Sequence, residues 1–140
     1  MIWKIPVKLD MGAIMPTRAY PTDAGLDLYT PIECAIAPKN GAVIDTGVHV
    51  AIPNGYVGFL KSKSGLNVKR GITSEGVIDS SYRGSIVVKL YNNSPVVQTF
   101  NKGDKITQLV LLPIITPELE LVDELDETDR GSNGFGSTGR

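Results

Sequence analysis

One glycine-bearing segment of this 140-residue chain combines a carboxylate, an aromatic ring and a tight turn at a spacing that suits hydrolysis. In EGVIDSSYRG (75–84), Asp79 directly follows the apolar pair Val77 and Ile78, and Tyr82 comes three residues later. A partly desolvated carboxylate can take a proton from an attacking water, so Asp79 is a candidate general base. A structural aspartate that caps a hairpin is the alternative.

A second segment, KSKSGLNVKRG (61–71), has the composition of an anion-binding site. Ser64 and Gly65 open a predicted helical turn, with Ser64 expected as its N-cap, and Lys61 and Lys63 precede them. Free backbone N–H groups, a hydroxyl and two cations together suit phosphate. A capped helix with solvated lysines is the alternative.

A third segment, DAGLDLYT (23–30), holds a carboxylate in an apolar setting. Asp27 lies between Leu26 and Leu28, two residues after Gly25, at the start of an expected strand. Such a side chain can point toward a site. A turn aspartate that bonds its own backbone is the simpler alternative.

The C-terminal stretch GSNGFGSTGR (131–140) is glycine-rich and carries one aromatic ring, Phe135. Such a composition buries too little apolar surface to hold itself in place and predicts disorder. We therefore expect one domain over 1–130 and a flexible arm over 131–140. The arm is either a frayed end or a segment that orders on a ligand.

The elements that must position these residues are strands. Apolar residues alternate over 2–9, 42–52, 55–62, 85–92 and 105–114, and turn signals such as PTDAG, APKNG and FNKGD separate the runs. This pattern predicts an all-β sandwich, jelly roll or barrel. A small all-β chain leaves open sheet edges, which favours self-association with exchange of a terminal segment.

Charge and composition exclude several classes of function. The stretch 117–130 holds seven of the fifteen acidic residues and is expected as a solvated surface strand, and the body before it is only mildly basic, too little for a nucleic-acid surface. No run resembles a membrane span or a secretory leader, which makes an intracellular, cytoplasmic protein the default. One cysteine, Cys34, and one histidine, His49, cannot form a Cys/His zinc site, and His49 is expected to be structural or subunit-facing.

Taken in order, five segments resemble the five motifs of the trimeric dUTP pyrophosphatase (dUTPase) family. AGLDLYT, KSGLNVKRGI, GVIDSSYRGSIVVKLYN, GDKITQLVLLPI and DRGSNGFGSTGR follow one another from Ala24 to Arg140. The resemblance implies a jelly-roll-like β-barrel or sandwich, a homotrimer with intersubunit active sites, and a mobile C-terminal arm. It implies hydrolysis of dUTP to dUMP and pyrophosphate by Mg²⁺-assisted attack of water at the α-phosphorus, which keeps uracil out of DNA and supplies dUMP for dTMP synthesis.

The resemblance also implies a role for each matched residue. Asp79 would activate the attacking water, and Asp27 would line the site and hold hydrated Mg²⁺ through water. The remaining matched residues would bind substrate. Tyr82 would pack under deoxyribose and exclude a 2′-hydroxyl, and the backbone of Gly76, Val77 and Ile78 would read uracil with no room for a thymine methyl. The phosphates would be contacted by Lys63, Ser64, Gly65 and Gln108. At the C-terminus, Phe135 would stack on uracil, and the β- and γ-phosphates would be enclosed by Arg130, Gly136, Ser137 and Thr138.

Two positions depart from the family pattern. Lys63 stands where the family usually has arginine, which keeps the charge and loses the bidentate fork. Asn133 stands where the arm usually has glycine, and asparagine tolerates left-handed backbone.

Two other functions remain open at this stage. A dCTP deaminase-like enzyme shares the fold class but needs a different acid–base group beside the base. Some phage-encoded dUTPases also bind regulatory proteins, so a regulatory partner is the second alternative.

Overall fold

The computed structural model describes residues 4–139, and within them the chain forms ten strands and one short helix. The bounds are β1 (Val7–Leu9), β2 (Gly25–Tyr29), β3 (Cys34–Ile36), β4 (Gly41–Asp45), β5 (Val48–Val50), β6 (Tyr56–Lys61), α1 (Ser64–Arg70), β7 (Ile72–Ile78), β8 (Val87–Asn92), β9 (Gln98–Phe100) and β10 (Lys105–Pro113). The all-β expectation is confirmed.

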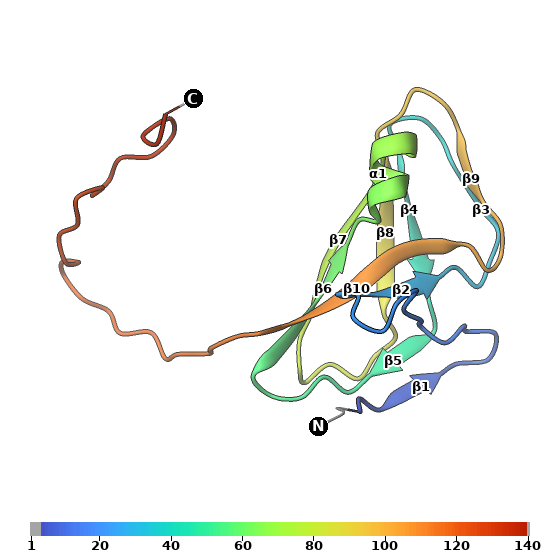
Figure 1. The fold of residues 1–140 in the computed structure, drawn as a ribbon, viewed down its shortest axis with the longest axis horizontal. Coiled ribbons are helices and arrows are strands. Elements are labelled where there is room, and N and C mark those ends of the chain that lie inside the picture. Colours follow the sequence, from blue (N-terminus) through green and yellow to red (C-terminus); the bar gives the residue numbers. More distant parts are fainter. Residues whose placement is uncertain (1–3, 140) are drawn as a thin grey trace.

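The strands form one large sheet and two small ones, and every pairing between strands is antiparallel. The six-stranded sheet has the order β2-β10-β6-β7-β8-β4, and β1-β5 and β3-β9 pair beside it. Figure 1 shows the sheet curling around a common interior, with α1 at one end and the loop that follows β7 at the other. This arrangement puts two of the candidate motifs at opposite ends of the body.

The interior is filled by aliphatic side chains that alternate with exposed ones along each strand. In β8, Val88, Leu90 and Asn92 are buried, while Val87, Lys89 and Tyr91 face outward. The period of two is what a sheet with one covered face requires. The buried core includes Leu28, Ile36, Ile44, Leu60, Ile72, Ile86, Leu90, Phe100, Ile106 and Leu109.

Some local predictions are wrong. The run 42–52 is not one strand but two, because the chain turns at Thr46 and at Gly47, which has a φ of +69°. The N-cap of α1 is Lys63, not Ser64: Lys63 has the extended dihedrals, and Ser64 is already helical. No side chain caps this helix end, and the Lys63 side chain reaches away to Asp27 instead.

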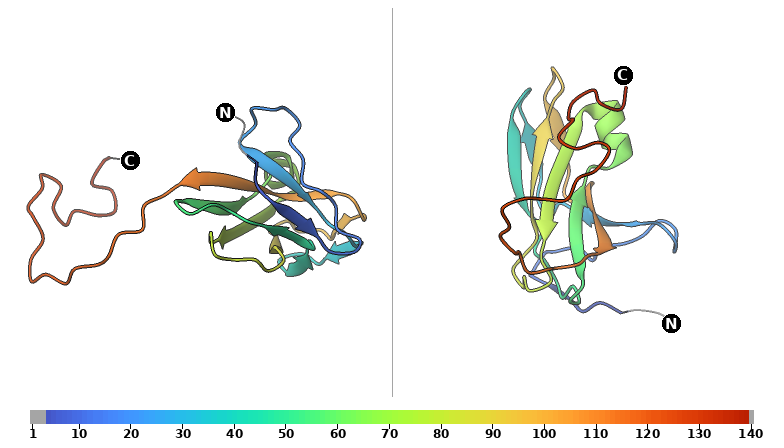
Figure 2. Two further views of the ribbon diagram at one scale, coloured as in Figure 1. Left: turned by 90° about the horizontal axis from the view of Figure 1, so that it is seen from below. Right: turned by 90° about the vertical axis from the view of Figure 1, so that its left-hand side faces the viewer.

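The chain beyond β10 leaves the body. Residues 114–139 contain no strand, so the surface strand expected over 117–130 does not form in the single chain, and these residues are exposed. The left view in Figure 2 shows this segment running away from the strands and curving back at a distance. Among residues 4–139, no helix is long and apolar enough to cross a membrane.

Candidate functional site

Asp27 is held in the middle of β2 by backbone bonds on both sides. Its N–H donates to the Thr17 carbonyl at 2.7 Å, and its register partner across the sheet is Gln108 of β10. Because neighbours along a strand face opposite ways, Leu28 enters the core while the Asp27 side chain leaves by the other face. The side chain is nonetheless only 7% exposed.

Two lysines neutralise this buried carboxylate. The Lys63 ammonium donates to Oδ1, and the Lys105 Nζ lies 3.1 Å from Oδ2. Burial alone would raise the pKa of Asp27, but the hydrogen bonds and charges of Lys63 and Lys105 together outweigh it and hold the pKa below its ordinary value. Asp27 is therefore an ionised anchor between two cations and not a turn aspartate.

Gln108 extends the polar group that begins at Asp27. Its Nε2 donates to the Ser62 carbonyl at 3.0 Å, which ties β10 to the segment before α1. Gly25 makes room for it, since a Cβ at Gly25 would lie 1.9 Å from the Gln108 Oε1. Ser64 and Gly65, next to Lys63 in the first turn of α1, are exposed. The structure thus brings Asp27, Lys63 and Gln108 together and puts Ser64 and Gly65 beside them.

A second group of candidate residues forms a shallow pocket of about 240 Å³ after β7. It is lined by Val77, Ile78, Asp79, Tyr82, Ser85 and Val87. Ile78 points into the core, whereas Val77 is 61% exposed and Asp79 is also exposed. The partial desolvation expected for Asp79 is therefore absent in the single chain, because the neighbouring apolar residues do not cover its carboxylate.

Tyr82 is fixed within this pocket by its own loop. Its Oη donates to the Ser85 carbonyl at 2.8 Å. A Cβ at Gly84 would lie 2.3 Å from that Oη, so glycine at this position is what lets the ring fold back over the loop. Gly76 has a different reason: its missing Cβ faces the Leu60 side chain at 3.0 Å, so packing between β6 and β7 already explains glycine there.

The two groups lie apart on one chain. Directly paired residues of antiparallel strands share a face, which puts Asp27, Gln108, Lys61 and Glu75 in one row across β2, β10, β6 and β7. Glu75 and Lys61 close this row with an ion pair at 2.6 Å. Asp79 comes four residues after Glu75, which corresponds to about 13 Å of extended chain. The two candidate catalytic carboxylates, Asp27 and Asp79, are not brought together.

The arm residues form a third, separate group. Phe135 is fully exposed, and the hydrogen bonds that the described arm makes are local: the Arg130 Nε donates to the Asn133 carbonyl at 2.9 Å, and Ser137 N–H donates to the Gly134 carbonyl at 3.0 Å. Gly136 and Thr138 are exposed too. Arg140, the last residue of the predicted arm, and residues 1–3 of the predicted domain lie outside the described residues.

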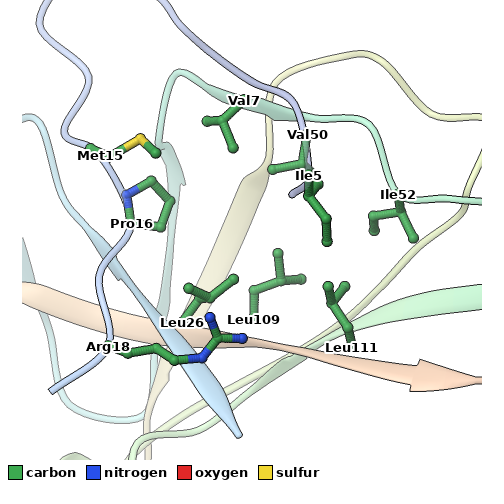
Figure 3. A pocket seen from close by; sticks show the side chains of 10 residues that line it. All are labelled: Ile5, Val7, Met15, Pro16, Arg18, Leu26, Val50, Ile52, Leu109 and Leu111. Carbon is green, nitrogen blue, oxygen red and sulfur yellow. The ribbon is translucent and has the colours of Figure 1, made fainter. Parts of the chain in front are cut away.

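An apolar hollow of about 320 Å³ elsewhere in the fold contains none of the candidate residues. Figure 3 shows side chains of the N-terminal segment, β5, β2 and β10 converging on it, with Arg18 as its charged member. A hollow with so few polar groups lacks the means to orient a nucleotide or activate water. The candidate residues all lie in the three polar groups and not in this hollow.

A comparison with protein families shows which family the chain belongs to. A family model described as dUTPase matches residues 12–139. The chain belongs to the dUTPase family. The deoxyuridine 5'-triphosphate nucleotidohydrolase of Cutibacterium acnes is 44% identical over 129 residues, which cover 89% of this chain and 85% of that protein.

Solved dUTPase structures share the fold over nearly the whole chain. A variant of the dUTPase of Staphylococcus bacteriophage 80alpha, solved with dUpNHpp, aligns with a TM-score of 0.92 at 34% identity and covers 98% of this chain and 99% of that one. A variant of the dUTPase of phage phi11 of S. aureus, described with a structural Mg(II) ion, aligns with a TM-score of 0.82 at 34% identity over 89% of this chain and 99% of that one. The family resemblance and the fold expected from the motifs are confirmed.

Three residues near the candidate site of this dUTPase-family chain, Lys105, Gly84 and His49, were not assigned to it from the sequence. Lys105, the second cation on Asp27, lies 78 positions away in sequence and meets it only through the pairing of β10 with β2. Gly84 leaves room for the Tyr82 ring because it has no Cβ, and His49 forms a hydrogen bond with the Arg83 carbonyl in the same loop. Of these three residues, only Gly84 had a signal in the sequence, because it belongs to the dipeptide Arg83-Gly84 that follows Tyr82 in the third motif.

Proposed function

We propose that this chain hydrolyses dUTP to dUMP and pyrophosphate, with Asp79 as the base that activates the attacking water. The observation that carries the proposal is the pocket after β7, where a carboxylate, an anchored tyrosine and an exposed backbone edge meet in a dUTPase-family chain. General base catalysis needs the carboxylate within reach of a water at the α-phosphorus. An enzyme of this kind limits uracil in DNA and supplies dUMP, and an intracellular location fits its substrate.

The same pocket supports selection of deoxyuridine. Gly76, Val77 and Ile78 pair with β6 on one side, whereas the pairing of β7 with β8 is confined to Ile72–Ser74. Their backbone groups on the β8 side would pair with uracil, and cytosine would present a donor where uracil presents an acceptor. Tyr82 would lie under the deoxyribose, where its fixed ring would exclude a 2′-hydroxyl. Rejection of the thymine methyl at Gly76 stays a prediction, since packing against Leu60 already accounts for that glycine.

The group around Asp27 supports binding of the triphosphate. Lys63 and Lys105 supply positive charge, and Ser64, Gly65 and Gln108 supply donors beside them. Their first effect is to hold the phosphates in a fixed orientation, and their second is to offset the charge that develops on the oxygens.

A magnesium ion fits this group only as a hydrated ion. Both oxygens of Asp27 already bond lysines, and residues 4–139 hold no cluster of three His, Cys, Asp or Glu side chains suited to a metal. Mg²⁺ keeps several waters and prefers phosphate oxygens, so it would arrive with the triphosphate and reach Asp27 through water. When bound, it would polarise the phosphate oxygens. The phage phi11 relative is described with a structural Mg(II) ion, so magnesium binding has a precedent in a similar protein.

The separation of the three groups supports a homotrimer with sites between subunits. One chain would contribute the pocket after β7, a second the Asp27 group, and the arm, residues 131–140, would cross to close the site. Val77 and Val87, which line the pocket, are exposed apolar residues of the kind that subunit contacts cover.

The activity is tested by pyrophosphate release from dUTP, UTP, dCTP and dTTP, each with and without Mg²⁺. We expect turnover of dUTP alone, dependent on the metal. Release of ammonia from dCTP would instead establish the deaminase alternative. Turnover of UTP at the rate of dUTP would contradict the role given to Tyr82.

Lys63 gives a prediction about the phosphate group. Lys63→Ala should lower kcat/KM for dUTP by about 10- to 100-fold, since it removes a hydrogen bond to a charged, buried group. The pKa of Asp27 should rise toward its ordinary value. A carboxylate whose pKa is lowered in the folded state stabilises the fold above its unfolded pKa, and this contribution is lost as pH falls through the folded pKa. The free energy of unfolding of Lys63→Ala should therefore rise less between acid and neutral pH than that of the unaltered protein.

Lys63→Arg is the matched variant, because it keeps the charge and restores the residue usual in the family. It should retain activity, and thermal melts from pH 3 to 7 should separate the two variants. Unchanged kcat/KM in Lys63→Ala would rule out a role for Lys63 at the phosphates.

A further inference from the structure

The loop that carries Tyr82 is fastened to the body by His49. Between the end of β7 at Ile78 and the start of β8 at Val87 the chain forms no strand, so its conformation depends on individual bonds. The His49 Nδ1 lies 2.7 Å from the carbonyl of Arg83, the residue that follows Tyr82. His49 itself stands on β5, and the Ile86 N–H bonds the adjacent Val48 carbonyl at 2.8 Å.

The other ring nitrogen of His49 is bonded as well. Its Nε2 lies 3.0 Å from the Asp10 Oδ2, and the side chain is only 20% exposed. A peptide carbonyl and a carboxylate both accept hydrogen bonds, and a neutral imidazole carries a single N–H. Only the imidazolium satisfies both partners at once. The geometry therefore selects the protonated ring.

Other charged groups near the ring act in both directions. Lys8, opposite His49 in the pairing of β1 with β5, opposes protonation, and Asp10 favours it. Asp45 of β4 accepts from the Ser85 hydroxyl, and the Arg83 guanidinium turns back to the Ser80 carbonyl at 2.6 Å. The bond to the Arg83 carbonyl and then the bond to Asp10 raise the pKa of His49 above its ordinary value.

We propose that His49, as an imidazolium bonded to Asp10 and to the Arg83 carbonyl, is a positioning residue that sets Tyr82 in the substrate pocket. The proposal rests on the function proposed above for Tyr82. A group whose folded pKa is raised stabilises its bonded state fully below the unfolded pKa of about 6.5 and loses that contribution as pH rises through the folded pKa. Binding of substrate should weaken over that interval.

His49 is the single histidine of the chain, so its ring protons give one unambiguous NMR titration. We expect a midpoint above 6.5 for the unaltered protein, and the Kd for dUpNHpp should rise about five- to tenfold over the same pH interval, as for the loss of one hydrogen bond. Asp10→Asn should move both midpoints together to lower pH. For His49→Gln, the Kd for dUpNHpp should show no rise over this pH interval. Subtracting the pH dependence of Kd for His49→Gln from that of the unaltered protein removes the effect of the ligand's own titration.

Glu33→Gln, a change of an exposed acid outside this group, is the control and should leave both midpoints in place. A purely structural His49 would show its NMR titration with no matching step in Kd, and that outcome overturns the proposal. So does a midpoint at or below 6.5, or one that Asp10→Asn leaves unmoved. If the unaltered chain does not hydrolyse dUTP, both the proposed function and this role of His49 are wrong. If it hydrolyses dUTP, but the Kd for dUpNHpp differs between the unaltered protein and His49→Gln by the same factor at every pH, only the role of His49 is wrong.

Discussion

Replacing Asp79 by asparagine should lower kcat for dUTP by about 10²- to 10⁴-fold, the usual contribution of a positioned general base. Asparagine has nearly the shape of aspartate and can still orient a water, but it cannot take up the proton. The Kd for dUpNHpp should change little, because the carboxylate acts on water and not on the nucleotide. Pyrophosphate release and calorimetry of analogue binding measure the two quantities separately.

Asp79 is exposed in the single chain, so a second exposed aspartate, Asp23, provides a matched control. Asp23→Asn removes a carboxylate from a turn in which Asp23 Oδ2 accepts the Tyr20 N–H at 3.0 Å, and asparagine keeps that acceptor. This variant should be fully active. An Asp79→Asn protein that folds and retains a tenth or more of the activity would show that the base lies elsewhere.

Mixed assemblies extend the same prediction to the subunit arrangement. If Asp79 and Lys63 reach one site from different chains, then Asp79→Asn and Lys63→Ala chains that refold together must form some sites with neither change. Activity should then exceed the sum of the two separate variants. Strict additivity would mean that each site is built from one chain, against the proposed intersubunit site.

Removing residues 131–140 should leave the folded assembly intact and lower kcat/KM for dUTP by at least about 100-fold. The described arm is exposed and bonds only within itself and to Thr128 and Arg130 just before it, so its loss costs the body no packing. In the closed state Phe135 would stack on uracil for about 1–3 kcal/mol, equivalent to about 5- to 150-fold, and the phosphate contacts of the arm would add to this. Glycine-rich sequence permits such closure because it imposes little backbone restriction.

Phe135→Ala should reproduce the stacking part of this loss in the full-length arm, with an unchanged melting temperature. Asn133→Gly restores the residue usual in the family and should keep full activity, which makes it the matched control. Steady-state kinetics with thermal melts distinguish the three proteins. Full activity in the truncated chain would mean that residues 131–140 are a frayed end.

The fold class followed from sequence because strand alternation is a local property. In β8 the buried and exposed residues alternate as the pattern 85–92 predicts, since each side chain's direction is fixed by its neighbours in the pleat. The short strands β3 and β9 were not predicted, because three residues carry too little periodicity. The run of β7 was not predicted either, because its buried Ser74 breaks the apolar alternation. Residue type alone predicted Ser64 as the N-cap of α1. The N-cap is Lys63, and its side chain bonds Asp27 in β2, a partner that the local sequence does not reveal.

The site divides in the same way. The order of the motifs by itself determined the family and pointed to Asp79, Tyr82 and the arm, because the residue types and their local spacing are enough to specify a motif. Only the tertiary structure decided that Asp27 is an ionised carboxylate between Lys63 and Lys105, that Gly25 makes room for Gln108, and that His49 holds the Tyr82 loop. These contacts join residues tens of positions apart, and strand register, which the sequence does not display, brings them within hydrogen-bond distance.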